Sequence, residues 1–318
     1  MTGFTRACLL LLRASILLLL ACSLLRWVPG GWGVPDHLRI GLLWLALPLL
    51  VVTMTARRWL LLVPLGLSVL VNAALVFPTW LSPAAGQGAS VTLLHTNVWN
   101  QNPSMDAWAA LVRERRPDLA VVLERHYHHQ AYAWAVQLAE ILPYHADCGI
   151  SDCGNNVLSR WPLRQIGVTT SPWHDAPTRP SFLAVRVERP EGPFTLVTAH
   201  LSRPFDRPVQ EAQVDWLLDR LREMPPPVLL AGDFNAAPWS PLMRRIMRDA
   251  GLVRLSVTGP TWPSGWLLPF GIPIDHVLGG SGIGAGGQVL VLRDVGSDHR
   301  PVLVRFTLPA ADAGTRSD

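Results

Sequence analysis

The sequence predicts an α/β protein, a sandwich of mixed β-sheets with helices outside, preceded by a hydrophobic N-terminal region. Residues 1–87 are almost entirely apolar, whereas the rest of the 318-residue chain has the composition of a soluble domain. In that remainder, short apolar runs and amphipathic segments alternate without a strict βαβ rhythm, and short turns join several neighbouring runs. This irregular alternation favours a mixed sandwich over a doubly wound parallel sheet.

Three apolar runs occupy the N-terminal region, at residues 7–25, 40–56 and 59–77. Each is close to the minimum length of about 17 residues that crosses a bilayer. We therefore expect about three transmembrane helices within residues 1–82. Tryptophans lie at the ends of the runs, where interfacial aromatic residues belong: Trp27, Trp32, Trp59 and Trp80. A cleaved signal peptide is the alternative for the first run, since Leu19, Leu20, Ala21 and Cys22 faintly resemble a lipoprotein cleavage site.

Charged residues beside these runs predict the orientation of the chain. Arg6 and the Arg57–Arg58 pair place the N-terminus and the second loop on the cytoplasmic side, whereas Arg26 and Arg39 count against this assignment. All 27 basic residues are arginine, and Ala, Pro and Gly are abundant, which suggests a GC-rich bacterial genome. We expect a bacterial inner-membrane protein whose soluble domain faces the periplasm or the cell exterior.

A cysteine pair agrees with an oxidising compartment. Cys148 and Cys153 lie five residues apart in the soluble part, without the second pair that a structural zinc site requires. A short-loop disulfide fits this spacing, and two free thiols are the alternative.

We expect the soluble domain, with its strands and helices, at residues 91–308. A linker is expected before it at residues 83–90, and a disordered tail after it at residues 309–318. The predicted strands are residues 91–95, 119–123, 155–159, 182–187, 194–199, 228–231, 274–278, 288–292 and 302–306. The predicted helices begin at Ser104, span about 127–142, begin near Asp206 and Pro208, and span 241–250.

Polar side chains follow these strands wherever an apolar run ends. They are Asn97, Glu124, His200, Asp233 with Asn235, Asp275 with His276, and Asp298 with His299. One such residue is explained by a cap or an Asx turn, and this applies to Gly232–Asp233–Phe234–Asn235 taken alone. Six such ends in one domain indicate an active site at a sheet edge.

The domain resembles the endonuclease/exonuclease/phosphatase superfamily, metal-dependent phosphoesterases that include deoxyribonucleases and bacterial sphingomyelinases. The matching segments follow the family's order over about residues 88–308: HTNVWN, DLAVVLE, GNNVLSRWP, TAHLS, AGDFNAAP, PIDHVL and GSDHRPV. The resemblance implies a four-layer fold, two mixed β-sheets face to face with helices outside.

The resemblance also implies roles for individual residues. Glu124 is the first metal ligand, assisted by the amide oxygen of Asn97 and by Asp298, and Mg²⁺ is the expected ion, with Mn²⁺ as an alternative. Asp233 orients or deprotonates the attacking water, and Asn235 binds phosphate. Asp275 orients His299, which contacts the scissile phosphate. His200 matches a position that donates to the phosphate or the leaving group.

Other residues are weaker candidates. Arg160 and Arg179 are suited to phosphate contacts or to surface ion pairs. Many family members carry a second acid where this chain has Trp99. The loop at residues 259–273, with Trp262, Trp266 and Phe270, could insert into lipid, stack on a base or pack internally.

We expect a membrane-anchored, magnesium-dependent phosphodiesterase, nuclease-type by family default. From residue 88 to 308 the sequence holds 20 arginines and 20 acidic residues, so no broad basic surface supports general nucleic-acid binding. A phosphodiesterase acting on phospholipid or sphingomyelin head groups is the alternative substrate reading. A catalytically silent binding domain is the alternative of another class. The sequence assigns no oligomeric state.

Overall fold

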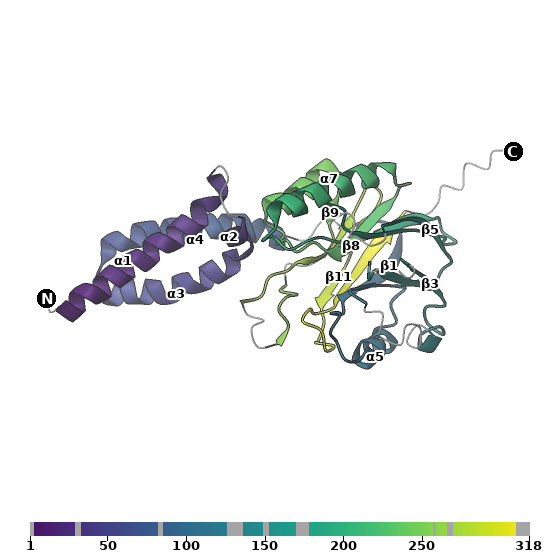
Figure 1. Cartoon of the computed structure of the whole chain (residues 1–318), viewed down its shortest axis with the longest axis horizontal. Helices are drawn as coiled ribbons and strands as arrows, with labels where there is room; N and C mark the ends of the chain where they lie inside the picture. Colours follow the sequence, from purple (N-terminus) through teal and green to yellow (C-terminus); the bar gives the residue numbers. More distant parts are fainter. Residues whose placement is uncertain are drawn as a thin grey trace.

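The protein consists of a bundle of apolar helices and an α/β sandwich that pack against each other end to end (Figure 1). The structure, a computed structural model, describes residues 3–28, 33–81, 85–125, 136–148, 153–169, 178–256, 259–265 and 270–309. Trp32, Trp266, the start of the predicted linker, most of the predicted helix at 127–142 and the predicted disordered tail from residue 310 lie outside these residues.

Three longer helices form the bundle: α1 (Gly3–Leu24), α3 (Arg39–Thr55) and α4 (Leu62–Val76). Short elements extend or connect them: η1 (Leu25–Trp27), α2 (Val34–His37), η2 (Trp59–Leu61) and η3 (Phe77–Trp80). Among the described residues, two continuous helical stretches, Gly3–Trp27 and Trp59–Trp80, are long and apolar enough to cross a membrane. They coincide with the first and third predicted spans.

The middle predicted span differs from the other two. The helix Arg39–Thr55 is apolar but has only 17 residues, with Pro48 inside it. At 1.5 Å per residue it is about 25 Å long, shorter than a typical hydrocarbon core of about 30 Å. Length and composition therefore identify two spanning helices in place of the predicted three.

Two six-stranded mixed sheets form the sandwich. Sheet A has the strand order β11-β12-β1-β2-β4-β3, and sheet B has the order β5-β6-β7-β8-β10-β9. The strands of sheet A are β1 (Ala89–Asn97), β2 (Leu119–Leu123), β3 (Tyr144–Asp147), β4 (Asn156–Ser159), β11 (Gly284–Val291) and β12 (Val302–Leu308). Those of sheet B are β5 (Leu163–Thr169), β6 (Ser181–Val187), β7 (Phe194–His200), β8 (Val228–Asp233), β9 (Val253–Arg254) and β10 (Asp275–Gly279).

Each sheet contains one parallel pair near its centre. β1 runs parallel to β2, and β7 runs parallel to β8, whereas the other pairings are antiparallel. A helix crosses over between the members of each pair: α5 (Asp106–Arg115) in sheet A and α7 (Arg207–Glu223) in sheet B. The carboxyl ends of both parallel pairs consequently lie at the same end of the sandwich, where the predicted site residues stand.

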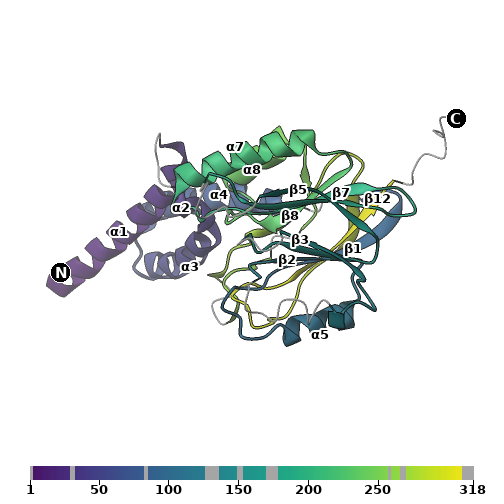
Figure 2. The same cartoon turned by 45° about the vertical axis from the view of Figure 1, so that its right-hand side comes forward.

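Apolar packing explains the four layers, which Figure 2 shows from the side. A central core joins the inner faces of the two sheets, for example through Phe194 and Phe306, whose ring centroids are 6.0 Å apart. α5 buries Trp108 and Leu111 against the outer face of sheet A. α7 and α8 (Pro241–Asp249) cover the outer face of sheet B. The structure thus confirms two mixed sheets flanked by helices.

A buried polar network closes the end of the bundle that meets the sandwich. Arg39 is fully buried; its Nε donates to Asp36 Oδ1 over 2.8 Å and its Nη1 donates to Asn72 Oδ1 over 2.8 Å. Asn72 in turn donates to Ser23 Oγ over 2.8 Å. Residues from α1, α2, α3 and α4 are joined by these bonds, so the orientation of α2 is fixed by charge-assisted contacts.

Helix α2 also contacts the sandwich, at the loop that follows β8. The backbone N–H of Ala237 donates to His37 Nδ1 over 3.0 Å, and Trp239 Nε1 donates to the carbonyl oxygen of Asp36. Val76, Ala237 and Trp239 are buried together, with Ile40 packed against them. The loop after β8 is therefore fixed to the bundle by hydrogen bonds and apolar packing.

The network makes a prediction about stability. Substitution Asp36→Ala leaves the buried Arg39 guanidinium without its carboxylate, which we expect to cost about 3 kcal/mol. Thermal unfolding of the full-length chain in detergent, followed by circular dichroism, measures the loss. Asp219→Ala, which removes an exposed carboxylate in α7, is the matched control; equal melting temperatures for the two variants contradict the prediction.

Candidate active site

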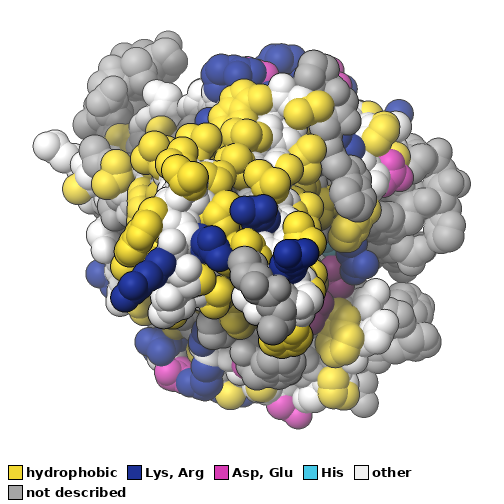
Figure 3. All heavy atoms as spheres, turned by 90° about the vertical axis from the view of Figure 1, so that its left-hand side faces the viewer, with side chains coloured by type: hydrophobic (Ala, Val, Ile, Leu, Met, Phe, Trp, Pro, Cys, Tyr) yellow, Lys and Arg dark blue, Asp and Glu magenta, His cyan; other side chains and the backbone are white. Residues whose placement is uncertain are grey.

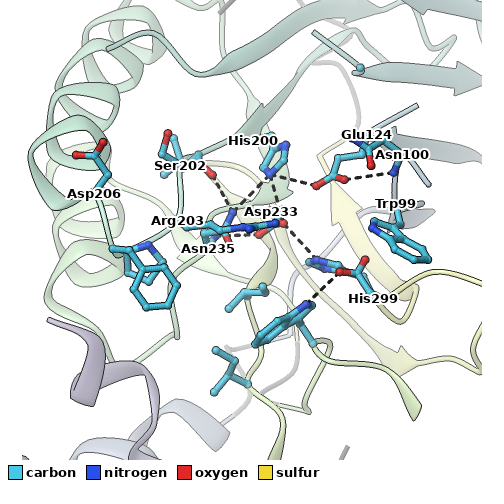
Figure 4. Close-up of a pocket in the computed structure, with 18 of the residues that line it drawn as sticks. Trp99, Asn100, Glu124, His200, Ser202, Arg203, Asp206, Asp233, Asn235 and His299 are labelled. Carbon is cyan, nitrogen blue, oxygen red and sulfur yellow. Dashed lines mark hydrogen bonds and ion pairs between the residues drawn. The ribbon is translucent and has the colours of Figure 1, made fainter. Parts of the chain in front are cut away.

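A cleft of about 1150 Å³ lies at the end of the sandwich where β1, β2, β7 and β8 finish. Sheet A contributes Trp99, Asn100 and Glu124, and sheet B contributes His200, Asp233 and Asn235. Figure 4 shows these side chains directed toward one another from opposite sides of the cleft. The predicted site residues at the strand ends, which are up to 202 positions apart in the sequence (Asn97 to His299), therefore meet here.

Sheet A holds Glu124 in a constrained backbone. Glu124 and Trp99 have left-handed φ values of 56° and 59°, respectively, and Asn235 across the cleft has 48°. Residues other than glycine adopt this conformation at a cost of about 1–3 kcal/mol, and they concentrate at functional sites. Glu124 Oε1 accepts a hydrogen bond from Asn97 Nδ2 over 2.9 Å, and Oε2 accepts one from the backbone of Asn100 over 3.4 Å.

Sheet B places Asp233 at the centre of the site. Its Oδ2 lies 3.6 Å from Nε2 of both His200 and His299, and it accepts from Asn97 Nδ2 over 3.1 Å. A Cβ atom on Gly232 would come within 1.9 Å of the Ala199 carbonyl oxygen. Only glycine allows β7 and β8 to approach so closely, and this approach brings His200 beside Asp233.

The loop after β8 bends back onto its own strand. Asp233 Oδ1 accepts the backbone N–H of Asn235 over 2.8 Å, which is an Asx turn. Asn235 Nδ2 donates to the Leu201 carbonyl over 2.8 Å and lies 3.5 Å from His200 Nε2. From sequence alone, Gly232–Asp233–Phe234–Asn235 could be either an Asx turn or part of an active site. In the structure this segment forms the turn and also lines the cleft.

His276, the second residue of β10, contacts the loop that follows β8. Its Nε2 donates to the carbonyl of Ala236 over 2.8 Å, and its ring stacks on Phe234 with centroids 5.8 Å apart. Burial lowers the pKa of His276 from 6.5 to about 3, so the ring is neutral in the folded protein.

A histidine, an aspartate and a second histidine form a buried row beside Asp233. Asp275 Oδ2 is 2.8 Å from His299 Nδ1, and Asp275 Oδ1 is 3.0 Å from His95 Nε2. All three side chains are buried. Because Asp275 accepts from Nδ1, the ring of His299 directs Nε2 into the cleft.

The ionisation of these groups follows from burial and from their neighbours. Burial alone would lower the pKa of His299. The carboxylates of Asp275 and Asp233 outweigh this effect and raise the pKa to about 10. Burial would raise the pKa of Asp275, yet His299 and the hydrogen bonds from both histidines hold it well below its usual value. The pair is therefore an imidazolium and a carboxylate at neutral pH.

Three further carboxyl groups, those of Glu124, Asp233 and Asp298, line the cleft together with His299. Burial raises the pKa of Asp233 and of Asp298, and the neighbouring Glu124 carboxylate raises that of Asp298 further. Glu124 itself has a lowered pKa: burial opposes ionisation, but His200 and the hydrogen bond from Asn97 favour it. Carboxylates crowded in this way attract a cation.

The donor set fits a divalent metal ion. Ligand atoms of Glu124, His200 and Asp233 lie within 4.8 Å of one another. Asp298 Oδ2 accepts from Trp262 Nε1 over 3.2 Å, whereas its Oδ1 is buried without a hydrogen-bond partner among the described residues. A buried carboxylate oxygen without a partner is costly unless a cation compensates it. Carboxylate oxygens are the ligands that Mg²⁺ prefers.

The side chain of Asn97 connects the two carboxylates of the site. The predicted metal ligand was its amide oxygen, but Oδ1 accepts the backbone N–H of Trp99 over 3.0 Å. This donor fixes the amide orientation, so Nδ2 points at Glu124 and Asp233 and bridges the two carboxylates. In this structure Asn97 therefore positions two acids, and its part as a metal ligand stays a prediction.

The two predicted arginines do not reach the cleft. Arg160 is exposed and pairs with Asp118, with Nη1 and Oδ1 2.5 Å apart. Arg179 is exposed, and neither side chain lines the cleft. The cleft instead contains Arg125 and Arg203, which the sequence did not single out. Which arginine reaches a site depends on loop geometry, and no local pattern encodes it.

One buried histidine of the site was not predicted, and the predicted cysteine pair lies at the cleft. His95 was missed although HTNVWN contains it, because a histidine inside a strand gives no local signal; its partner Asp275 is 180 positions away. Cys148 and Cys153 are joined by a disulfide in the structure, and both line the cleft.

Comparison with known proteins agrees with this geometry. A family model described as the Endonuclease/Exonuclease/phosphatase family matches residues 94–299. A UPF0294 protein of Vibrio vulnificus strain YJ016 is 35% identical over 103 residues, which are 31% of this chain and 34% of that protein. The match thus spans about a third of this curated relative's length.

Solved structures share the fold at low sequence identity. An endonuclease/exonuclease/phosphatase from Beutenbergia cavernae has a TM-score of 0.55 and 22% identity, covering 69% of this chain and 72% of that one. The human Nocturnin catalytic domain has a TM-score of 0.53 and 14% identity, covering 70% and 96%. A Staphylococcus aureus beta toxin mutant with bound magnesium ions has a TM-score of 0.51 and 13% identity, and the match covers 69% of this chain and 100% of that one.

The buried His276 makes a prediction about pH. Between its unfolded pKa of 6.5 and its folded pKa of about 3, the unfolded chain binds a proton that the folded chain excludes. Stability is therefore lost as pH falls below 6.5, by about 1.4 kcal/mol per pH unit. In His276→Gln an amide donates to the same carbonyl and does not titrate, so we expect a smaller fall in melting temperature from pH 7 to pH 5. Parallel falls for both proteins count against this assignment.

Proposed function

Because the chain belongs to the endonuclease/exonuclease/phosphatase family, we propose that it is a metal-dependent phosphodiesterase that uses water as the nucleophile. The observation that carries the proposal is the convergence of Glu124, His200, Asp233 and His299 on one cleft. An oxygen of Asp298, which also lines the cleft, has no hydrogen-bond partner among the described residues. A structural role for this cluster is a poor alternative, since buried acids at such density weaken a fold that has no ligand to compensate them.

The side chains divide the chemistry between them. Glu124 and Asp298 would hold the metal ion, with Asp233 close enough to complete its carboxylate side. When bound, a divalent cation polarises the phosphoryl oxygens and lowers the pKa of the attacking water. Magnesium is the ion we propose, with manganese as the alternative, because the donors are oxygens and because the related beta toxin fold holds magnesium.

Proton transfer falls to Asp233, whose Oδ2 faces the centre of the cleft. A water held there donates one hydrogen bond to Oδ2, which orients it or takes its proton as it attacks phosphorus. His299, kept cationic by Asp275, donates Nε2–H to a phosphate oxygen, and charge that develops on that oxygen strengthens the bond. Asn235 Nδ2 and His200 Nε2 lie 3.5 Å apart and together form a second set of donors. His200 serves the leaving oxygen, which favours a diester over a monoester.

The apolar bundle anchors this domain in the membrane. We propose that the spans at 7–25 and 59–77 cross the bilayer and that the shorter helix α3 lies with them as a third, thinner span. Arg26 and Arg39, which oppose the proposed orientation in sequence, both pair with Asp36 at the sandwich end of the bundle, where Arg39 is buried and Arg26 is partly buried. Exposed arginines remain at the other end, at Arg6, Arg57 and Arg58, and Figure 3 shows arginine side chains among apolar ones on that face. This distribution supports a cytoplasmic tip and an extracytoplasmic catalytic domain.

The proposed activity is tested with variants of Asp233 and His299. Asp233→Asn removes the proton acceptor and His299→Gln removes the cationic donor, so each lowers hydrolysis of bis-p-nitrophenyl phosphate by about 10²–10⁴-fold. Chelation with EDTA abolishes the activity, and added Mg²⁺ or Mn²⁺ restores it. Asp294→Asn, an exposed acid in the loop before β12, is the control and retains wild-type activity.

The same assay tests the alternative of another class, a silent binding domain. If no phosphoester among mono- and diesters, oligonucleotides and phospholipids is hydrolysed with any divalent metal, the enzymatic proposal is wrong. Activity that survives Glu124→Ala and chelation equally excludes the metal-dependent mechanism.

A reporter fusion tests the orientation. Alkaline phosphatase fused after Leu308 is active only outside the cytoplasm, and green fluorescent protein at the same point fluoresces only inside. We expect an active phosphatase and a dark fluorescent protein in a bacterial host. The opposite result places the catalytic domain in the cytoplasm and removes the oxidising compartment that the Cys148–Cys153 disulfide needs.

A further inference from the structure

We infer that the phosphate ester hydrolysed in the cleft belongs to a phospholipid of the membrane that holds the helical bundle. The inference rests on the phosphodiesterase activity proposed above and adds the substrate class and the route by which it arrives. It depends on one feature of the structure, the wall that the bundle contributes to the cleft.

The cleft is lined by both parts of the molecule. Val34, His37 and Leu38, from the connection between the first two long helices, line the same cleft as His200, Asp233 and His299. Leu38 directly precedes α3 and is 46% exposed. The catalytic groups therefore open toward the end of the bundle, where the apolar helices leave the bilayer.

The distance between this wall and the catalytic groups is fixed. The bond from the Ala237 backbone to His37 lies two residues beyond Asn235, and Trp239 binds the backbone of Asp36. A flexible tether would let the catalytic domain move freely above the membrane. This junction instead holds the cleft against the bundle, at the level of the membrane surface.

Two exposed phenylalanines lie at the cleft and at the bundle. Phe205, which lines the cleft, is 70% exposed, and Phe270, in the loop before β10, is 56% exposed. The Phe270 ring lies edge-to-face with Trp44 of α3, with centroids 6.4 Å apart. Trp44 is five residues inside an apolar helix, so Phe270 lies at the depth expected for the bilayer interface.

Charge favours a lipid over a nucleic acid. The catalytic domain carries equal numbers of arginines and acidic residues, 20 of each between residues 88 and 308. The described arginines of the cleft are Arg125 and Arg203, and His299 adds one further cation. A nucleic acid presents a row of phosphates and is bound by a row of cations. A single phosphodiester with apolar chains matches both the charge and the apolar rim.

The reaction is a hydrolysis that needs no further reactant. The oxygen of water forms a bond to phosphorus, and the bond between phosphorus and one ester oxygen breaks. The departing alcohol takes up a proton, and the other product is a phosphate monoester. One of the two products carries the acyl chains and stays in the bilayer.

Reconstituted full-length protein tests the inference. Proteoliposomes of phosphatidylcholine and phosphatidylglycerol contain isotopically labelled lipid, and unlabelled protein-free vesicles and a single-stranded oligonucleotide are added with Mg²⁺. Mass spectrometry follows the loss of each phospholipid and of the oligonucleotide, and bis-p-nitrophenyl phosphate is assayed in parallel. We expect the lipid of the host vesicles to be hydrolysed at least about tenfold faster than lipid in the separate vesicles.

Variants of the apolar rim give a second readout. Leu38→Asn and Phe270→Ser each lower the ratio of host-lipid hydrolysis to bis-p-nitrophenyl phosphate hydrolysis by about tenfold, the effect of losing one apolar side-chain contact. Tyr144→Ser removes a tyrosine that is 42% exposed on β3 and is level with Ser159 and Leu119, at the end of sheet A opposite to Glu124. This control leaves the ratio unchanged.

The outcomes separate the inference from the function on which it rests. Hydrolysis of the soluble diester without hydrolysis of host lipid, or preferential cleavage of the oligonucleotide, overturns the lipid inference and leaves the phosphodiesterase intact. A ratio that does not change in Leu38→Asn and Phe270→Ser also overturns it. Absence of any hydrolysis overturns the proposed function itself.

Discussion

The crowding of negative charge where the two sheets meet is the constraint on which the site depends. Glu124, Asp233, Asp275 and Asp298 come from four separate segments, and burial of each opposes its ionisation. The surrounding groups act against this crowding. His95 and His299 flank Asp275, Asn97 Nδ2 bridges Glu124 and Asp233, and His200 lies 3.6 Å from both. Asp298 Oδ1 is buried without a hydrogen-bond partner among the described residues, which is the observation that a bound cation would explain.

The fold delivers these groups through its two parallel strand pairs. In each sheet a helix crosses over between the paired strands, so two strand ends are brought to the same edge. Asn97 and Glu124 follow β1 and β2, and His200 and Asp233 end β7 and β8. Because the sheets pack face to face, the two edges oppose each other across the cleft. The close approach at Gly232 and the left-handed backbone at Glu124 then determine the final positions of the side chains.

The sequence predicted those parts of the structure that depend on local patterns. Apolar runs located β1, β2, β7, β8 and β12, and the polar residues that follow them identified most of the cleft. The prediction missed β3, β5 and β9: β3 and β5 have partly exposed residues, and β9 has only two, so none forms a buried apolar run. The orientation of the Asn97 amide, the pairing of Arg160 with Asp118 and the role of His95 depend on partners distant in sequence. No local periodicity records such partners.

The junction between the bundle and the sandwich also bears on how the protein is made. The loop that follows Asp233 docks on His37, which lies 200 positions earlier in the chain. Synthesis proceeds from the N-terminus, so the first helices emerge and can enter the membrane long before this loop exists. In the membrane-anchored arrangement proposed above, the loop after β8 completes its contacts on a surface that is already in place. The placement of Asp233 and Asn235 is thereby coupled to correct assembly of the N-terminal helices, and a chain whose helices do not assemble lacks the docking surface for this loop.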